Sequence, residues 1–114
     1  TFNDAKKIGL TIGNSNLVKT ALFASDANWG RIMAAIGYSG IKVNPDKIDL
    51  FFNNVKMVGN GVGLGIDAER EATEVLKQKE FAITVDLRLG KAEATVWTCD
   101  LSYDYVKINA AYRT

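Results

Sequence analysis

At 114 residues, the chain has the length of one domain and can bury roughly two thirds of the surface that its unfolded form exposes. Its net charge of +1 and 47% apolar content give no field that would recruit nucleic acid or an anionic membrane. With no histidine and one cysteine, Cys99, we expect no Ser–His or Cys–His pair, no transition-metal site and no internal disulfide. Any chemistry is left to carboxylates, lysines and hydroxyls, and a reducing compartment fits this composition.

The first forty residues predict two helices with a strand between them. Thr1 or Asn3 can cap a first helix that ends at Gly13-Asn14. The inward residues of this helix are Ala5, Ile8 and Ile12. Leu17–Phe23 contains β-branched and large apolar residues and predicts a strand. Asp26 can cap a second helix, with Trp29, Ile32, Met33 and Ile36 turned inward.

Two short apolar strands, Ile48–Phe52 and Val55–Val58, are expected next. A glycine-rich stretch then leads to a third helix from Asp67 to about Lys79. The inward residues of the third helix are Ala68, Ala72, Val75 and Leu76.

The clearest pattern lies in Phe81–Leu89, where apolar and more polar residues alternate with a period of two. Gly90-Lys91 is expected to turn this strand into a hairpin, and Ala92–Trp97 to return antiparallel. The elements together predict an α+β fold, with a small mixed sheet, a C-terminal antiparallel hairpin and about three helices packed mainly on one face.

The last sixteen residues predict an ordered, closely packed end. Ser102 is a good N-cap, Leu101 precedes it, and Val106 stands where a hydrophobic staple would close, which favours a helical turn. Asn109 offers donors and an acceptor suited to an amino-acid ligand, and Thr114 brings a hydroxyl and a carboxylate. The structural alternative is a capping or surface asparagine beside an ordinary chain end.

A loose dinucleotide fingerprint, Gly63-x-Gly65-x-x-Ala68, lies between a possible strand and the third helix. A carboxylate at Asp67 would repel a phosphate at that helix start, and the expected antiparallel return does not suit a nucleotide-binding βαβ unit. A mobile or tightly turned glycine loop is therefore the favoured interpretation.

Thr1 can be considered as an N-terminal nucleophile with its own amine as base, although helix capping is the favoured role. Structural roles are likewise favoured for Ser25–Arg31 and for Lys19 and Thr20, and Cys99 is expected in the core. Two alternative functions remain open: a self-contained N-terminal-threonine hydrolase, and a small non-enzymatic interaction module.

Several motifs in fixed order resemble ornithine acetyltransferase, an enzyme of arginine biosynthesis. They are Leu17-Val-Lys-Thr-Ala21, Asp26-Ala-Asn-Trp-Gly-Arg-Ile32, Cys99-Asp-Leu101, Tyr105-Val-Lys-Ile-Asn-Ala110 and the final Thr114. Members of that family cleave themselves before a threonine, which carries acetyl from N-acetylornithine to glutamate; some also use acetyl-CoA.

The resemblance implies that residues 1–114 form the C-terminal domain of the family's β chain. The nucleophile then lies outside this chain, which holds no catalytic residue, and the isolated chain is expected to be inactive. Asn109 and Thr114 fall on the family's substrate contacts. The expected partners are the α chain and the rest of the β chain in an α2β2 heterotetramer. No cofactor, metal, nucleic acid or membrane is implied, and the expected location is the cytoplasm, or the mitochondrial matrix of a eukaryote.

Overall fold

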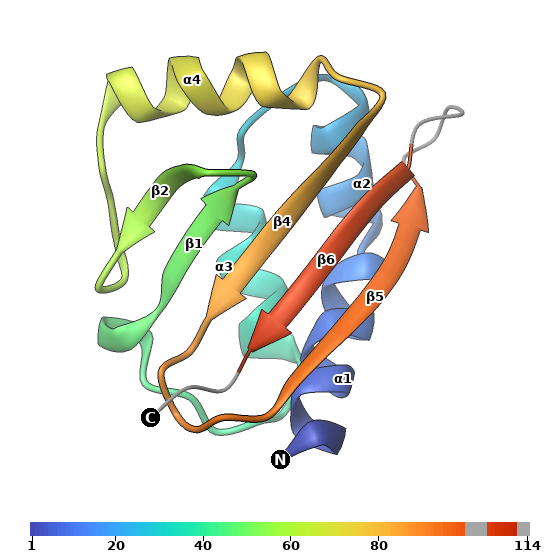
Figure 1. The fold of residues 1–114 in the computed structure, drawn as a ribbon, viewed down its shortest axis with the longest axis vertical. Coiled ribbons are helices and arrows are strands. Elements are labelled where there is room, and N and C mark those ends of the chain that lie inside the picture. Colours follow the sequence, from blue (N-terminus) through green and yellow to red (C-terminus); the bar gives the residue numbers. More distant parts are fainter. Residues whose placement is uncertain (100–104, 112–114) are drawn as a thin grey trace.

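The computed structural model describes residues 1–99 and 105–111, and Figure 1 shows helices packed on a single sheet. The elements in chain order are α1 (Phe2–Gly13), α2 (Asn16–Phe23), α3 (Trp29–Tyr38), a 3-10 helix (Pro45–Lys47), β1 (Asp49–Phe52), β2 (Val55–Gly59), β3 (Val62–Gly63), α4 (Ile66–Leu76), β4 (Glu80–Asp86), β5 (Glu93–Cys99) and β6 (Tyr105–Ala111). The six strands follow the order β3-β2-β1-β4-β6-β5. The predicted α+β class is confirmed.

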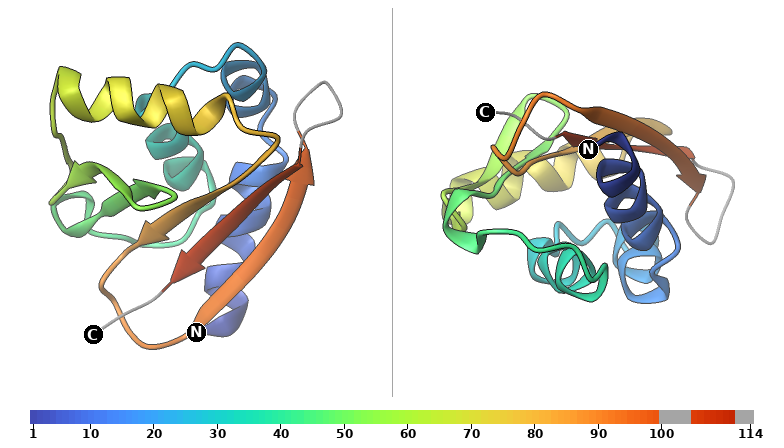
Figure 2. Two further views of the ribbon diagram at one scale, coloured as in Figure 1. Left: turned by 45° about the horizontal axis from the view of Figure 1, so that its top comes forward. Right: turned by 90° about the horizontal axis from the view of Figure 1, so that it is seen from below.

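The sheet is mixed because β4 and β6 pair in parallel, whereas the other neighbouring strands are antiparallel. Helix α1 crosses β5 and β6, and α4 packs against β1 and β2. In the described part of the chain the helices lie on one side of the sheet, as Figure 2 shows. No helix among the described residues is long and apolar enough to cross a membrane.

The core lies between this helical layer and the inner face of the sheet. In β4, Phe81, Ile83 and Val85 are buried, and the residues between them are only partly covered. The other large side chains that are fully enclosed are Phe52, Ile8, Ile12, Ile32, Ile36, Ile48, Leu50, Met57, Leu87 and Val18. Burying one such side chain contributes about 1.5–3 kcal/mol, so this face stabilises the domain.

The strand predicted over Leu17–Phe23 is wrong, because these residues form helix α2. The hydroxyl of Ser15 accepts a hydrogen bond from the backbone N–H of Val18 at 3.3 Å and caps the first turn. The buried residues recur with helical spacing: Val18, Ala21 and Leu22. The periodicity of a short apolar run does not distinguish a strand from a helix, and here the cap at Ser15 favours the helix.

The predicted hairpin has the right strands and the wrong pairing. Strands β4 and β5 run in opposite directions, but β6 lies between them and pairs with both. The connection from Leu87 to Ala92 is six residues long, whereas a tight hairpin uses two. This longer connection spans the width of the inserted strand. The antiparallel pair at this end of the chain is therefore β5 with β6.

A helical turn was predicted after Ser102. In the part of this segment that the structure describes, the prediction is wrong, because Tyr105–Ala111 forms strand β6. Leu101 and Ser102 themselves lie outside the described residues. In sequence, Val106, Ile108 and Ala110 alternate with Lys107 and Asn109, which is a strand period. Two neighbouring strands offer backbone partners to this segment, and a helix would leave both without them.

The ends of two helices differ from their predicted positions. Helix α3 is capped by Asn28, whose side-chain oxygen accepts from the N–H of Arg31 at 3.2 Å, and the predicted cap was Asp26. Helix α4 begins at Ile66 and ends at Leu76, so Asp67 lies in its first turn. A carboxylate there is favourable, because the N-terminal end of a helix carries a partial positive charge.

A hydrogen bond over a long sequence separation ties α1 to β5. The hydroxyl of Thr98 donates to the backbone oxygen of Gly13 at 2.9 Å, at the end of α1. We expect Thr98→Val to lower the free energy of unfolding by about 1 kcal/mol, because valine keeps the β-branched shape and removes the donor. Urea unfolding of the purified protein measures this, with Thr98→Ser as the control that keeps the hydroxyl. A valine variant as stable as the serine variant would show that the bond contributes nothing.

Candidate functional site

The predicted contact Asn109 lies in the middle of strand β6, where backbone pairing fixes its neighbours. It stands opposite Thr84 of β4 and Thr95 of β5. Phe51 of β1 pairs with Thr84 and with Lys56 of β2, so one row crosses five strands. The second predicted contact, Thr114, lies outside the described residues.

This row belongs to the face of the sheet that the described helices leave uncovered. Thr84 and Phe51 are partly buried, and Thr95 is exposed. In the adjacent row, Trp97 is 69% exposed, which is unusual for so large an apolar side chain. Thr84, Thr95 and Trp97 therefore mark a surface that a ligand or another part of the protein can reach.

Arg88 fastens the end of β4, beside the end of β6. Its Nε donates to the backbone oxygen of Lys47 at 2.8 Å, and its guanidinium also donates to the side-chain oxygen of Asn60. Asp86, the last residue of β4, accepts from the backbone N–H of Arg88 at 3.0 Å and pairs in register with Ala111. These bonds join β4, the β2–β3 turn and the 3-10 helix near the point where β6 ends.

The Ser25–Arg31 segment is a compact connection between α2 and α3. The amide nitrogen of Asn28 donates to the Asp26 carboxylate at 3.2 Å, and Ser25 has a positive φ of 54°. Arg31 donates to the backbone oxygen of Leu17 at 2.9 Å. The segment lines a hollow of about 310 Å³ together with Glu69 of α4. Most of its polar groups hold the loop in shape, as the favoured structural interpretation predicts.

The glycine-rich stretch forms a hairpin and a helix start. Asn60 and Gly61 connect β2 to β3 with φ of 51° and 78°, the backbone of a type I′ turn. Gly63 lies against the ring of Trp29, and Gly65 caps α4 without a side-chain bond. Strand β4, which follows α4, runs antiparallel to β3, because each of the three successive strand pairs from β3 to β4 is antiparallel. The parallel strand–helix–strand unit that a dinucleotide site requires is therefore missing here.

The hydroxyls of two other candidate residues, Thr1 and Thr20, form hydrogen bonds with the backbone of helices. Thr1 accepts from the N–H of Asp4 at 3.2 Å and caps α1, which was its favoured role. Thr20 donates to the backbone oxygen of Asn16 at 2.7 Å on α2, and Lys19 is partly buried on the same helix.

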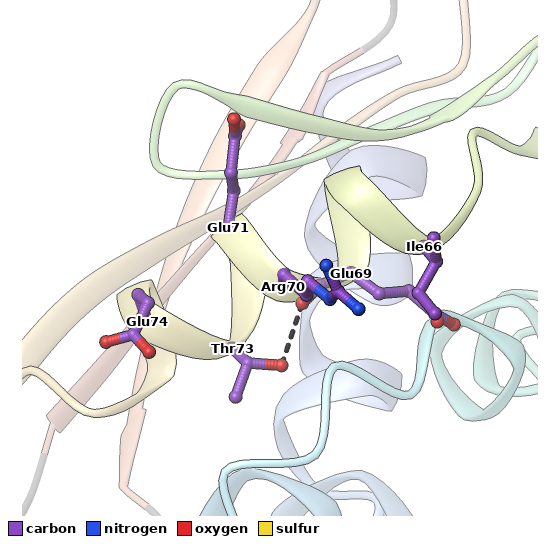
Figure 3. A pocket seen from close by; sticks show the side chains of 6 residues that line it. All are labelled: Ile66, Glu69, Arg70, Glu71, Thr73 and Glu74. Carbon is purple, nitrogen blue, oxygen red and sulfur yellow. Dashed lines mark hydrogen bonds between the residues drawn. The ribbon is translucent and has the colours of Figure 1, made fainter.

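A larger surface hollow of about 560 Å³ lies along α4. The residues that line it are Ile66, Glu69, Arg70, Glu71, Thr73 and Glu74. Figure 3 shows that these side chains spread along the helix, with Glu71 directed away from the others, and the hydroxyl of Thr73 donates to the backbone oxygen of Glu69 at 2.7 Å. The charges do not converge on one point, so this hollow has no arrangement suited to catalysis.

Comparison with known proteins identifies the chain's relatives. A family model described as the ArgJ family matches residues 1–114. An "Arginine biosynthesis bifunctional protein ArgJ" of Geobacter sulfurreducens is 62% identical over 111 residues, which are 97% of this chain and 28% of that protein. The protein of the same name from Syntrophotalea carbinolica is 54% identical, with the same coverage of both chains. The chain thus spans less than a third of these relatives.

A crystal structure of "Arginine biosynthesis bifunctional protein argJ" from Bacillus halodurans superposes with a TM-score of 0.83 at 39% identity. The match covers 91% of this chain and 49% of that one. The prediction that residues 1–114 are the C-terminal domain of a β chain stays a prediction. The match of the family model over the whole length, together with these identities, shows that the chain belongs to the ArgJ family.

Proposed function

We propose that the chain is the substrate-binding part of an acetyltransferase that moves acetyl from N-acetylornithine to glutamate. The observation that carries the proposal is the membership in a family whose relatives are named for arginine biosynthesis. The word "bifunctional" in those names suits an enzyme that also takes acetyl from acetyl-CoA. Such an enzyme works in the cytoplasm, where its amino-acid substrates are made.

The proposed reaction follows from the family resemblance and uses a threonine outside this chain. Its hydroxyl attacks the acetyl carbonyl of N-acetylornithine, the C–N bond breaks, and ornithine leaves as the amine. The amine of glutamate then attacks the acetyl-threonine ester, which restores the hydroxyl and releases N-acetylglutamate. The part played by residues 1–114 is to hold the amino acid in line with that nucleophile.

The relative lengths of the matched proteins support a cleaved precursor. The chain covers 49% of the solved Bacillus halodurans chain but 28% of the curated relatives, so the solved chain is much shorter than they are. A shorter chain is expected when a precursor is cut into α and β chains. We propose that this chain functions with the other parts of such an enzyme in an α2β2 heterotetramer.

Asn109 and Thr114 are the proposed substrate contacts, and their test uses the full-length enzyme. We expect Asn109→Ala to raise the KM for N-acetylornithine by an amount equivalent to about 1–3 kcal/mol of binding, because a lost polar partner leaves substrate groups unpaired. Thr114→Val should also raise the KM for N-acetylornithine. Steady-state kinetics with both substrates measure this, and mass spectrometry follows the acetyl-enzyme.

Asn54→Ala is the matched control, because Asn54 is exposed in the connection between β1 and β2, and strand β4 separates β1 and β2 from β6. Its kinetics should equal those of the unmodified enzyme. If Asn109→Ala and Thr114→Val both leave the KM unchanged, these residues do not bind the substrate. If the full-length enzyme transfers no acetyl between ornithine and glutamate, the proposed activity itself is wrong.

A further inference from the structure

The register of the sheet places two threonines on either side of Asn109. Thr84 stands beside it on the parallel strand β4, and Thr95 on the antiparallel strand β5. Neighbouring strands lie about 4.8 Å apart, and residues directly opposite each other on antiparallel strands have Cβ atoms about 4.5–5.5 Å apart. Two residues that bear hydroxyls therefore flank position 109, each about one strand spacing away.

The rest of the row shows that it faces away from the core. Ile83 and Val85, on either side of Thr84 in β4, are buried, and so are Ala94 and Val96 on either side of Thr95. Thr84 itself is partly buried and Thr95 exposed. Side chains alternate between faces along a strand, so the threonines occupy the uncovered face, and their hydroxyls are not needed to build the core.

We propose that Thr84 and Thr95 are positioning residues that orient the amide of Asn109 for the amino-acid substrate. This inference rests on the proposed role of Asn109. A hydroxyl can donate one hydrogen bond and accept others, so it can hold either end of an asparagine amide. An amide fixed in one orientation presents its oxygen and its nitrogen to defined substrate groups, whereas a freely rotating amide loses part of its binding to disorder.

The test replaces each hydroxyl without changing the shape of the strand. In the full-length enzyme, Thr84→Val and Thr95→Val keep the β-branched side chain and remove the hydrogen-bonding group, and Thr84→Ser and Thr95→Ser keep that group. We expect at least one valine variant to raise the KM for N-acetylornithine roughly three- to tenfold with kcat within about twofold, and its serine partner to restore the KM. Thr11→Val, on α1, is the control, because the Thr11 hydroxyl donates to the backbone oxygen of Lys7.

A double-mutant cycle separates positioning from independent binding. If Thr84 or Thr95 acts through Asn109, the valine change should raise the KM by no more than about twofold in an Asn109→Ala background. If the KM increases of the valine change and of Asn109→Ala multiply in full in the double variant, the inference is overturned. It is also overturned if Asn109→Ala raises the KM while both valine variants leave it unchanged. An unchanged KM in Asn109→Ala alone would instead show that the proposed substrate contact has failed, and the inference with it. Thermal unfolding of each variant confirms that the enzyme is folded.

Discussion

Replacing Gly61 by alanine is expected to lower the free energy of unfolding by roughly 2–5 kcal/mol. Gly61 has a φ of 78°, a left-handed conformation that costs an alanine about 1–2 kcal/mol. An added Cβ would also clash with the backbone oxygen of Pro45, so the turn or the 3-10 helix must shift. Overpacking of this kind typically costs about 1–3 kcal/mol more. Urea unfolding of the purified protein measures the loss.

Gly37→Ala is the matched control and should change stability in the opposite direction. Gly37 lies within α3, and an added Cβ there would meet no atom within 4 Å. Alanine in a helix is more stable than glycine by about 0.5–1 kcal/mol, so a small gain is expected. Equal effects of the two substitutions would show that neither the φ of Gly61 nor its contact with Pro45 matters.

The turn at Gly61 illustrates what local sequence can predict. An Asn-Gly pair between two apolar stretches is a strong signal for a two-residue hairpin, and it favours the tight turn over the mobile loop that the glycine content alone leaves open. The periodicity of β4 and the inward residues of α1 were also predicted correctly, because each depends only on the local repeat of apolar residues. The error at α2 has a local cause as well, since a short apolar run fits a strand or a helix, and the cap at Ser15 is what favours the helix.

The pairing of the strands could not be predicted in the same way. That β6 would lie between β4 and β5 depends on which of several partners buries its apolar residues best, and this is a property of the whole sheet. Thr84 and Thr95 consequently gave no sign of their position beside Asn109. The family motifs pointed to Asn109, but only the register shows which residues flank it.

Two adjacent phenylalanines in β1 test the division of the sheet into a core face and an uncovered face. Phe52 is fully enclosed, whereas Phe51 is partly buried beneath Lys56, whose Nζ lies 5.9 Å from the centre of its ring. A step of one residue along a strand moves the side chain to the opposite face. The same substitution at these two positions should therefore have very different effects.

We expect Phe52→Ala to lower the free energy of unfolding by about 3–5 kcal/mol, because it removes buried surface and leaves a cavity that the rigid core fills poorly. Phe51→Ala should cost only about 1 kcal/mol, since its ring already contacts water and its contact with Lys56 is weak. Urea unfolding of both variants measures the difference. Equal losses of stability would mean that the face carrying Phe51 is buried to the same degree as the core face. The row of Phe51, Thr84 and Asn109 would then be closed to an amino-acid substrate.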